Sequence, residues 1–148
     1  MDYRETNRRL IPAFRAGAAL PGMHRERLLL LTTTGRRSGD PQTTPMMFHR
    51  EDDRLFVIAS NVGAPREPDW CLNLRADPAV KVEAGDEPGS PAYAATASVL
   101  DGPDRAAVWG RITELYPFFM EHQRKTTREI PVVELSPDVT MAAAGVEG

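Results

Sequence analysis

Two arginines set between glycines form the part of this sequence best suited to bind an anion. Arg36 and Arg37 are followed by Ser38, and the three residues lie between Gly35 and Gly39. Arginine side chains are permanently charged and present their N–H donors in a fixed plane, which suits phosphate or carboxylate groups. Glycines let a ligand approach backbone N–H groups closely. The pattern therefore predicts a site for an anionic ligand, and a solvated turn is the alternative interpretation.

A second candidate site lies in residues 59–70, whose sequence is ASNVGAPREPDW. A loop of small residues lets a planar ring approach backbone N–H and C=O groups, and Trp70 enters the helix that follows. Asn73 and Arg75 come one turn later and are expected to point to the same end of the molecule. The alternative is an ordinary loop with Trp70 packed in the core.

Other kinds of site chemistry have little support in the sequence. Hydrolase, metalloprotease and nucleotide-binding motifs (GxSxG, HExxH, the Walker loop and GxGxxG) are absent. The histidines at positions 24, 49 and 122 show no metal-ligand spacing, so no metal site is expected. Cys71, the only cysteine, is expected to be a packed thiol rather than a nucleophile. The candidate sites that remain are therefore sites that bind a ligand.

The composition is typical of one soluble globular domain. The chain has 148 residues, of which 41% are hydrophobic and 26% charged, so residues 1–148 are predicted to form a single domain. The net charge of −3 disfavours a nucleic-acid partner. The first ten residues do not resemble a signal peptide, no apolar run is long enough to span a membrane, and a lone cysteine favours a reducing compartment. These features predict a cytoplasmic protein.

Strands joined by short turns dominate the middle of the chain. Hydrophobic periodicity and turn residues predict helices at 2–19, 68–76 and 101–116, with a further turn or two through residue 128. They predict strands at 28–34, 43–49, 55–60, 79–84, 92–100 and 130–135, and a frayed tail at 141–148. Strands 28–34 and 43–49 are expected to form a hairpin across the arginine loop. Because strands and helices do not alternate, an antiparallel barrel with peripheral helices is favoured over a parallel sheet.

Four segments together resemble the deazaflavin-dependent nitroreductase family of the flavin/deazaflavin oxidoreductase superfamily. They are LLLLTTTGRRSGDPQTTP, VIASNVGAPREPDWCLNLRADPAVKV, LYPFF and REIPVVEL, and they span residues 28–135 in the order of the family. The resemblance implies an α+β protein built on an antiparallel split β-barrel of about six strands. It also implies that coenzyme F420 delivers a hydride to a small electrophilic acceptor: a quinone, an enone or a nitroaromatic compound.

The resemblance further implies roles for single residues. The phosphate and glutamate tail of F420 are implied to bind at Thr33, Arg36, Arg37 and Ser38. The deazaflavin ring is implied to lie against Pro45, Ala59, Ser60, Gly63, Pro65 and Trp70. The same segment continues through Asn73 and Arg75, and Arg75 is implied to be a further anion contact. Ser60 is the implied hydrogen-bond donor to the acceptor. Tyr116 is implied to stack on the acceptor or to supply a proton, and a tyrosine merely packed at a helix end is the alternative.

Several positions depart from family members that reduce nitro drugs. Gln42 stands where those members have a basic residue, and Met47 where they have an aromatic one. Phe119 and His122 replace tyrosines. The wall facing the acceptor is therefore expected to differ. An FMN-dependent split-barrel oxidoreductase and a non-catalytic carrier of a cofactor or lipophilic ligand remain alternatives. Family members occur as monomers and dimers, so a homodimer is also an open interpretation.

Overall fold

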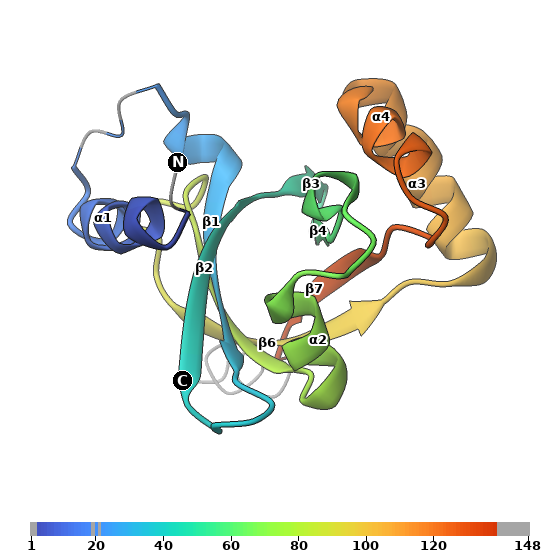
Figure 1. Cartoon of the computed structure of the whole chain (residues 1–148). Helices are drawn as coiled ribbons and strands as arrows, with labels where there is room; N and C mark the ends of the chain where they lie inside the picture. Colours follow the sequence, from blue (N-terminus) through green and yellow to red (C-terminus); the bar gives the residue numbers. More distant parts are fainter. Residues whose placement is uncertain (1–2, 19, 21, 139–148) are drawn as a thin grey trace.

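Short turns between β-prone segments fold the chain into one curled antiparallel sheet (Figure 1). The computed structural model describes residues 3–18, 20 and 22–138. The strands are β1 (Leu28–Thr34), β2 (Pro41–Met47), β3 (His49–Glu51), β4 (Arg54–Ile58), β5 (Ala79–Ala84), β6 (Tyr93–Val99) and β7 (Val132–Pro137). The α-helices are α1 (Tyr3–Arg15), α2 (Asp69–Ala76), α3 (Gly102–Leu115) and α4 (Phe118–Arg124). Two short 3-10 helices are η1 (Arg25–Arg27) and η2 (Asn61–Gly63). The strand order is β2-β1-β5-β6-β7-β4-β3.

One residue joins the two edges of this sheet. β2 ends at Met47 and β3 begins at His49, yet β2 and β3 lie at opposite ends of the strand order. In Figure 1 the chain arches from one edge to the other through this point, which curls the sheet toward a barrel. Phe48, the residue between the strands, is buried. The prediction of a single strand over 43–49 was therefore wrong, because alternating hydrophobicity does not reveal a change of pairing partner.

Both faces of β1 are buried, which explains its unbroken run of leucines. Leu29 and Leu31 point into the main core together with Val82 of β5. Leu30 points the other way and packs against Phe14 of α1. Successive side chains of a strand face opposite sides, so a strand covered on both sides needs apolar residues at every position. The N-terminal helix predicted from its apolar spacing thus covers the outer face of β1.

The hairpin predicted across the arginine loop is confirmed. β1 and β2 pair antiparallel from Leu28 opposite Met47 to Thr34 opposite Pro41. The other predicted strands are present with ends shifted by at most two residues, and β3 is an additional strand. The ends of the first predicted helix (residues 2 and 19) and the predicted tail (141–148) lie outside the described residues.

α3 and α4 cover the part of the sheet formed by β4 and β7. Val108 and Ile112 of α3 and Phe119 of α4 pack with Phe56 and Val132 of these strands. None of the helices that the structure describes carries an apolar stretch of the length needed to cross a bilayer. The fold thus leaves α2 and the end of the β1–β2 hairpin together on one side of the sheet (Figure 1).

Candidate functional site

The arginine loop is a tight turn that its own backbone holds closed. Gly35 N–H donates to the Asp40 carbonyl oxygen at 2.8 Å, and Gly39 N–H donates to the Gly35 carbonyl oxygen at 2.8 Å. A Cβ on Gly35 would lie 2.7 Å from Ser38 Oγ, so a larger residue here would require the Ser38 side chain to move. The turn therefore presents Arg36 at the tip of the hairpin.

Asn73 joins this turn to α2. Its Oδ1 accepts hydrogen bonds from Arg36, from the backbone N–H at 3.2 Å and from Nη1 at 2.8 Å. Its Nδ2 donates to Thr33 Oγ1 at 3.2 Å and to Gln42 Oε1 at 2.8 Å. Asn73 is 1% exposed, so these contacts satisfy an amide that would be costly to bury alone. The two segments singled out from the sequence are therefore neighbours in space.

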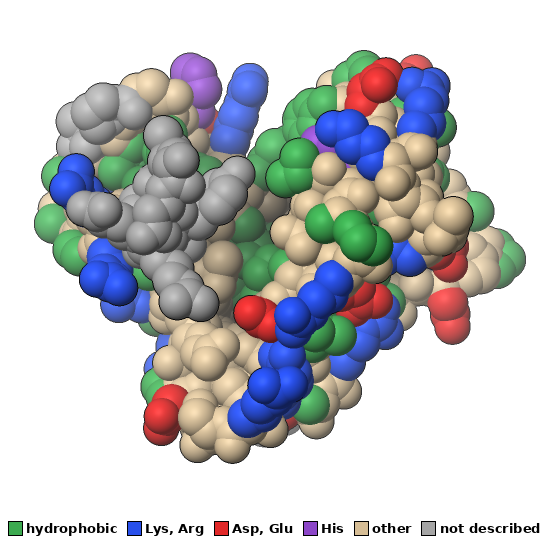
Figure 2. Space-filling model, in the orientation of Figure 1, with side chains coloured by type: hydrophobic (Ala, Val, Ile, Leu, Met, Phe, Trp, Pro, Cys, Tyr) green, Lys and Arg blue, Asp and Glu red, His purple; other side chains and the backbone are tan. Residues whose placement is uncertain are grey.

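Two cavities adjoin at this junction. The smaller, of about 210 Å³, is lined by Arg36, Arg37, Ser38, Gln42, Asp69 and Asn73. The larger, of about 480 Å³, has Pro45, Val62, Arg66, Pro68, Asp69 and Trp70 in its lining. Asp69 contributes to both. Figure 2 shows basic side chains gathered over α2, beside a hollow with hydrophobic side chains in it.

The charges around the cavities leave one arginine available for a ligand. Asp69 Oδ1 binds Arg36 Nη2 at 3.2 Å and Arg66 Nη2 at 3.0 Å, which neutralises this carboxylate. No hydrogen bond or ion pair joins Arg37 to another described residue. Its exposed guanidinium is therefore free to bind an anion, while Arg36 is already held in place.

Arg75 forms an ion pair with Glu67. Its Nε and Nη2 donate to the two carboxylate oxygens of Glu67 at 2.8 and 2.9 Å. This pairing lowers the pKa of Glu67. Arg75 lines neither of the two cavities. Its proposed role as an anion contact therefore requires the ligand to compete with Glu67.

A strained segment follows β4 and enters the larger cavity. Asn61, Val62 and Gly63 have φ values of 47°, 56° and 81°, and non-glycine residues rarely adopt such conformations. A Cβ on Gly63 would lie 2.5 Å from the His122 carbonyl oxygen, so glycine is required both for its conformation and for close packing on α4. Backbone strain of this kind persists only where the surroundings hold it.

Arg128, for which no role is predicted from the sequence, supplies much of that support. Its Nε donates to the Ala64 carbonyl oxygen at 2.9 Å, Nη1 to that of Ala59 at 3.2 Å and Nη2 to that of Ser60 at 2.7 Å. One guanidinium thus binds three backbone carbonyl groups of the segment. The only sequence signal was its position in REIPVVEL, one of the segments that carry the resemblance.

Ser60 and Tyr116, the two predicted catalytic residues, each pair with a histidine. Ser60 Oγ lies 3.1 Å from His122 Nδ1. Tyr116 Oη lies 3.4 Å from His49 Nδ1, and His49 Nε2 lies 3.1 Å from Glu51 Oε2. The sequence predicts no role for either histidine, because neither shows metal-ligand spacing. Sequence alone gave no signal for these pairs, because their members lie more than 60 residues apart.

Glu51 is the charged residue that contacts His49, the partner of Tyr116. Arg111 donates to its two oxygens at 2.9 and 2.8 Å. The bonds from Arg111, together with that from His49, lower the pKa of Glu51 to about 2. Glu51 is therefore ionised across the physiological range and orients the His49 ring.

The remaining predicted residues do not line the two cavities. The residues that line neither cavity are Thr33, Ala59, Ser60, Gly63, Pro65, Arg75 and Tyr116. Thr33, Ala59, Ser60 and Gly63 are buried, and Pro65 is exposed. Burial raises the pKa of Cys71 to about 12, so its thiol is neutral and packed, as predicted. Within the described part of the chain no three His, Cys, Asp or Glu side chains are placed to hold a metal ion.

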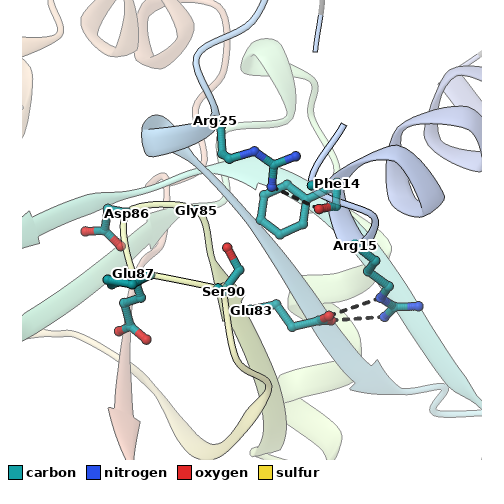
Figure 3. Close-up of a pocket in the computed structure, with 11 residues that line it drawn as sticks. Phe14, Arg15, Arg25, Glu83, Gly85, Asp86, Glu87 and Ser90 are labelled. Carbon is teal, nitrogen blue, oxygen red and sulfur yellow. Dashed lines mark hydrogen bonds and ion pairs between the residues drawn. The ribbon is translucent and has the colours of Figure 1, made fainter. Parts of the chain in front are cut away.

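A further cavity, of about 650 Å³, lies between α1 and the β5–β6 loop (Figure 3) and is lined by none of the predicted site residues. Asp86 and Glu87 accept hydrogen bonds from Arg50, outside the cavity, and its other charged groups bind one another or the backbone. Arg15 donates to both oxygens of Glu83 at 3.0 Å, and Arg25 Nη1 donates to the Phe14 carbonyl oxygen at 2.9 Å. The cavity is larger than the other two, but these contacts fasten α1 to the sheet and leave no free charged group among those residues for a ligand.

Comparison with known proteins gives one consistent result. A family model described as F420H(2)-dependent quinone reductase matches residues 4–137. An F420H(2)-dependent quinone reductase of Mycobacterium tuberculosis is 34% identical over 137 residues, covering 90% of this chain and 84% of the relative. A solved structure described as an F420-H2 dependent reductase has a TM-score of 0.65 and 36% identity, covering 78% of this chain and 100% of the other. Another, described as a domain-swapped dimer, has a TM-score of 0.68 and 33% identity, covering 90% and 95%.

Proposed function

The chain belongs to the F420H(2)-dependent quinone reductase family, and from this premise we propose that it binds coenzyme F420 in the two adjoining cavities and reduces a quinone. Family membership confirms the resemblance seen in the arginine loop and the Trp70 segment. The likeness to the solved F420-H2 dependent reductase confirms the predicted split-barrel class.

The observation that carries the proposal is the bond between Asn73 and Arg36. It places a basic turn directly beside a cavity lined by Trp70. F420 combines an anionic phosphate and glutamate tail with a planar ring, so it needs these two surroundings side by side. The guanidinium of Arg37, which is exposed and binds no other residue in the described part of the chain, suits the anionic part, because arginine binds phosphate and carboxylate in a planar, forked geometry. Pro45 and Trp70 offer apolar surface to the ring.

When bound, reduced F420 supplies the hydride, and the protein supplies position and polarity. In the proposed arrangement Arg36 and Arg37 hold the tail, Trp70 packs against the ring, and the Ser60 hydroxyl donates a hydrogen bond to the acceptor oxygen. Arg128 keeps the Ser60 backbone in place through the bond from Nη2 to its carbonyl oxygen. Tyr116, bonded to His49, is proposed to form the wall against which the acceptor lies.

A quinone is the acceptor that the surroundings favour. Val62 and Phe118 are 57% and 43% exposed, and their segments, η2 and α4, pack against each other. Exposed apolar side chains of this kind suit a lipophilic ring. Nitroaromatic compounds are a weaker proposal, because Met47 and Phe119 stand where the nitro-reducing members have an aromatic residue and a tyrosine. An enone is the alternative acceptor.

A binding titration tests the cofactor assignment against the two alternatives. Purified protein is titrated with oxidised F420 and, separately, with FMN, and quenching of cofactor fluorescence is followed. The proposal predicts tighter binding of F420. Preference for FMN would favour the FMN-dependent oxidoreductase. Binding of F420 with no protein-dependent turnover of menadione, a cyclic enone or a nitroimidazole would favour the non-catalytic carrier.

The oligomeric state of the protein can be measured separately. The solved relative described as a domain-swapped dimer supports a homodimer for this chain. Light scattering after size-exclusion chromatography would give twice the mass of one chain for a homodimer, and the mass of one chain would contradict it.

A further inference from the structure

Ser60 is linked to a titratable side chain that the family resemblance did not assign to the chemistry. Its Oγ lies 3.1 Å from Nδ1 of His122. Ser60 is 7% exposed, whereas His122 is only half-buried and retains access to solvent. We propose that His122, acting through the Ser60 hydroxyl, supplies the proton that a quinone takes up in addition to the hydride. This inference rests on the proposed function.

The quinone oxygen has to gain a proton in addition to the hydride. Reduction of a quinone to a hydroquinone adds two electrons and two protons in total, and a hydride carries both electrons and one of the protons. In the proposed step the Ser60 O–H bond breaks as an O–H bond forms on the quinone oxygen. The His122 Nδ1–H bond breaks as Ser60 regains its proton. The imidazolium becomes a neutral imidazole, which takes a proton from solvent for the next turnover.

The packing of η2 against α4 holds Ser60 and His122 next to each other. Gly63 fits directly against the His122 backbone, and Arg128 holds the Ser60 carbonyl oxygen from the α4–β7 connection. The His122 ring contacts those of Phe118 and Phe119, with centroid distances of 5.7 and 5.8 Å. The hydroxyl therefore meets the imidazole in one geometry, so that a proton has a defined route between them.

The charges around His122 set the sign of its pH dependence. Lys125 lies one turn along the same helix, Arg128 faces Ser60, and no carboxylate of the described residues lies within ion-pair distance of His122. Burial, and secondarily the charge of Lys125, lowers the pKa of His122 from its ordinary value of 6.5. His122 is therefore protonated at acidic pH and neutral at alkaline pH. Proton supply through Ser60 should weaken as the pH rises.

The first test needs neither cofactor nor acceptor. Imidazole proton resonances of the free protein are followed by NMR from pH 4.5 to 8.5, and His122 is assigned by its absence in His122→Asn. The inference predicts a His122 midpoint below 6.5 that falls further in Ser60→Ala, because the imidazolium loses a hydrogen-bond acceptor. An unchanged midpoint in Ser60→Ala would overturn the pair. The His24 midpoint in the same spectra serves as the internal control.

The second test is a pH profile of quinone reduction. With saturating reduced F420, kcat/KM for menadione should fall in the wild type as the pH rises through the His122 midpoint. In His122→Asn, whose amide keeps a hydrogen bond to Ser60 but cannot titrate, kcat/KM should be about 100-fold lower at acidic pH and independent of pH. His24→Asn should match the wild type. If kcat/KM of His122→Asn kept the pH dependence of the wild type, proton supply by His122 through Ser60 would be overturned and the proposed function would stand. If the wild type failed to bind F420, the proposed function itself would be overturned.

Discussion

Asn73 Oδ1 accepts two hydrogen bonds from Arg36, one from its backbone N–H at 3.2 Å and one from Nη1 at 2.8 Å. The anion-binding turn and the helix that carries Trp70 are therefore held by the same buried amide. The position of Arg36 depends on α2, so a change in this contact is expected to alter both the stability of the hairpin end and the binding of the cofactor tail.

Replacement of Asn73 tests this dependence. Asn73→Ala removes all four hydrogen bonds of the amide and should lower the free energy of unfolding by roughly 1–3 kcal/mol, because buried partners are left unsatisfied. Gln42→Ala, which removes only one of these bonds at an exposed position, should cost less than about 1 kcal/mol. Urea unfolding of both variants gives the comparison. Equal losses would show that the amide is not the junction described.

The two arginines should behave differently. Arg37→Ala should weaken F420 binding by about 10-fold or more and leave the unfolding midpoint unchanged, since Arg37 has no hydrogen-bond or ion-pair partner among the described residues. Arg36→Ala should weaken binding and also lower stability, because Arg36 binds Asn73 and Asp69. Lys81→Ala removes one exposed cation outside the cavities and is the charge-matched control. If Lys81→Ala weakens binding as much as Arg37→Ala, the effect is one of net charge.

Gly63 offers a test of the strained segment. Gly63→Ala introduces both an unfavourable φ of +81° and a contact of 2.5 Å with the His122 carbonyl oxygen. Gly89→Ala introduces the same kind of strain at a φ of +75° with nothing within 4 Å. The first variant should therefore be less stable than the second by roughly 1–3 kcal/mol, the usual cost of overpacking. Similar thermal midpoints would contradict the close packing of η2 on α4.

The pair of Glu51 and Arg111 predicts a pH dependence of stability. Bonding lowers the pKa of Glu51 from 4.5 to about 2, so the native state favours the ionised carboxylate. A lowered pKa contributes stability that is present above 4.5 and is lost as the pH falls toward about 2. The difference in free energy of unfolding between the wild type and Glu51→Gln should shrink over this window. A difference that stays constant between pH 6 and pH 2.5 would contradict the assignment.

Local sequence patterns predicted much of the fold because they report local physics. The leucine run of β1, the alternation in β5 and the glycines around Arg36 each follow from nearest-neighbour geometry. The passage of the chain from β2 to β3 at Phe48 was not predictable in this way. It depends on which distant strand each segment pairs with, and alternating hydrophobicity is the same for either partner.

The site was predictable in part for the same reason. Arg36, Arg37, Pro45 and Trp70 were found because the segments that carry them have recognisable sequences, and the structure places all of them around the two cavities. Arg128 and the partnership of Ser60 with His122 were missed. Their contacts join residues more than 60 positions apart, and the packing of α4 against η2 that creates them leaves no periodic signal in the sequence.

We propose that this chain transfers a hydride from reduced F420 to a quinone. This transfer is tested most directly by mixing the protein with reduced F420 and menadione in the absence of oxygen and following the return of oxidised F420 fluorescence. We expect rapid, protein-dependent oxidation of the cofactor. Arg37→Ala should slow this oxidation at low cofactor concentration, and a high cofactor concentration should restore its rate. Oxidation at the same rate with and without the protein would contradict the proposal.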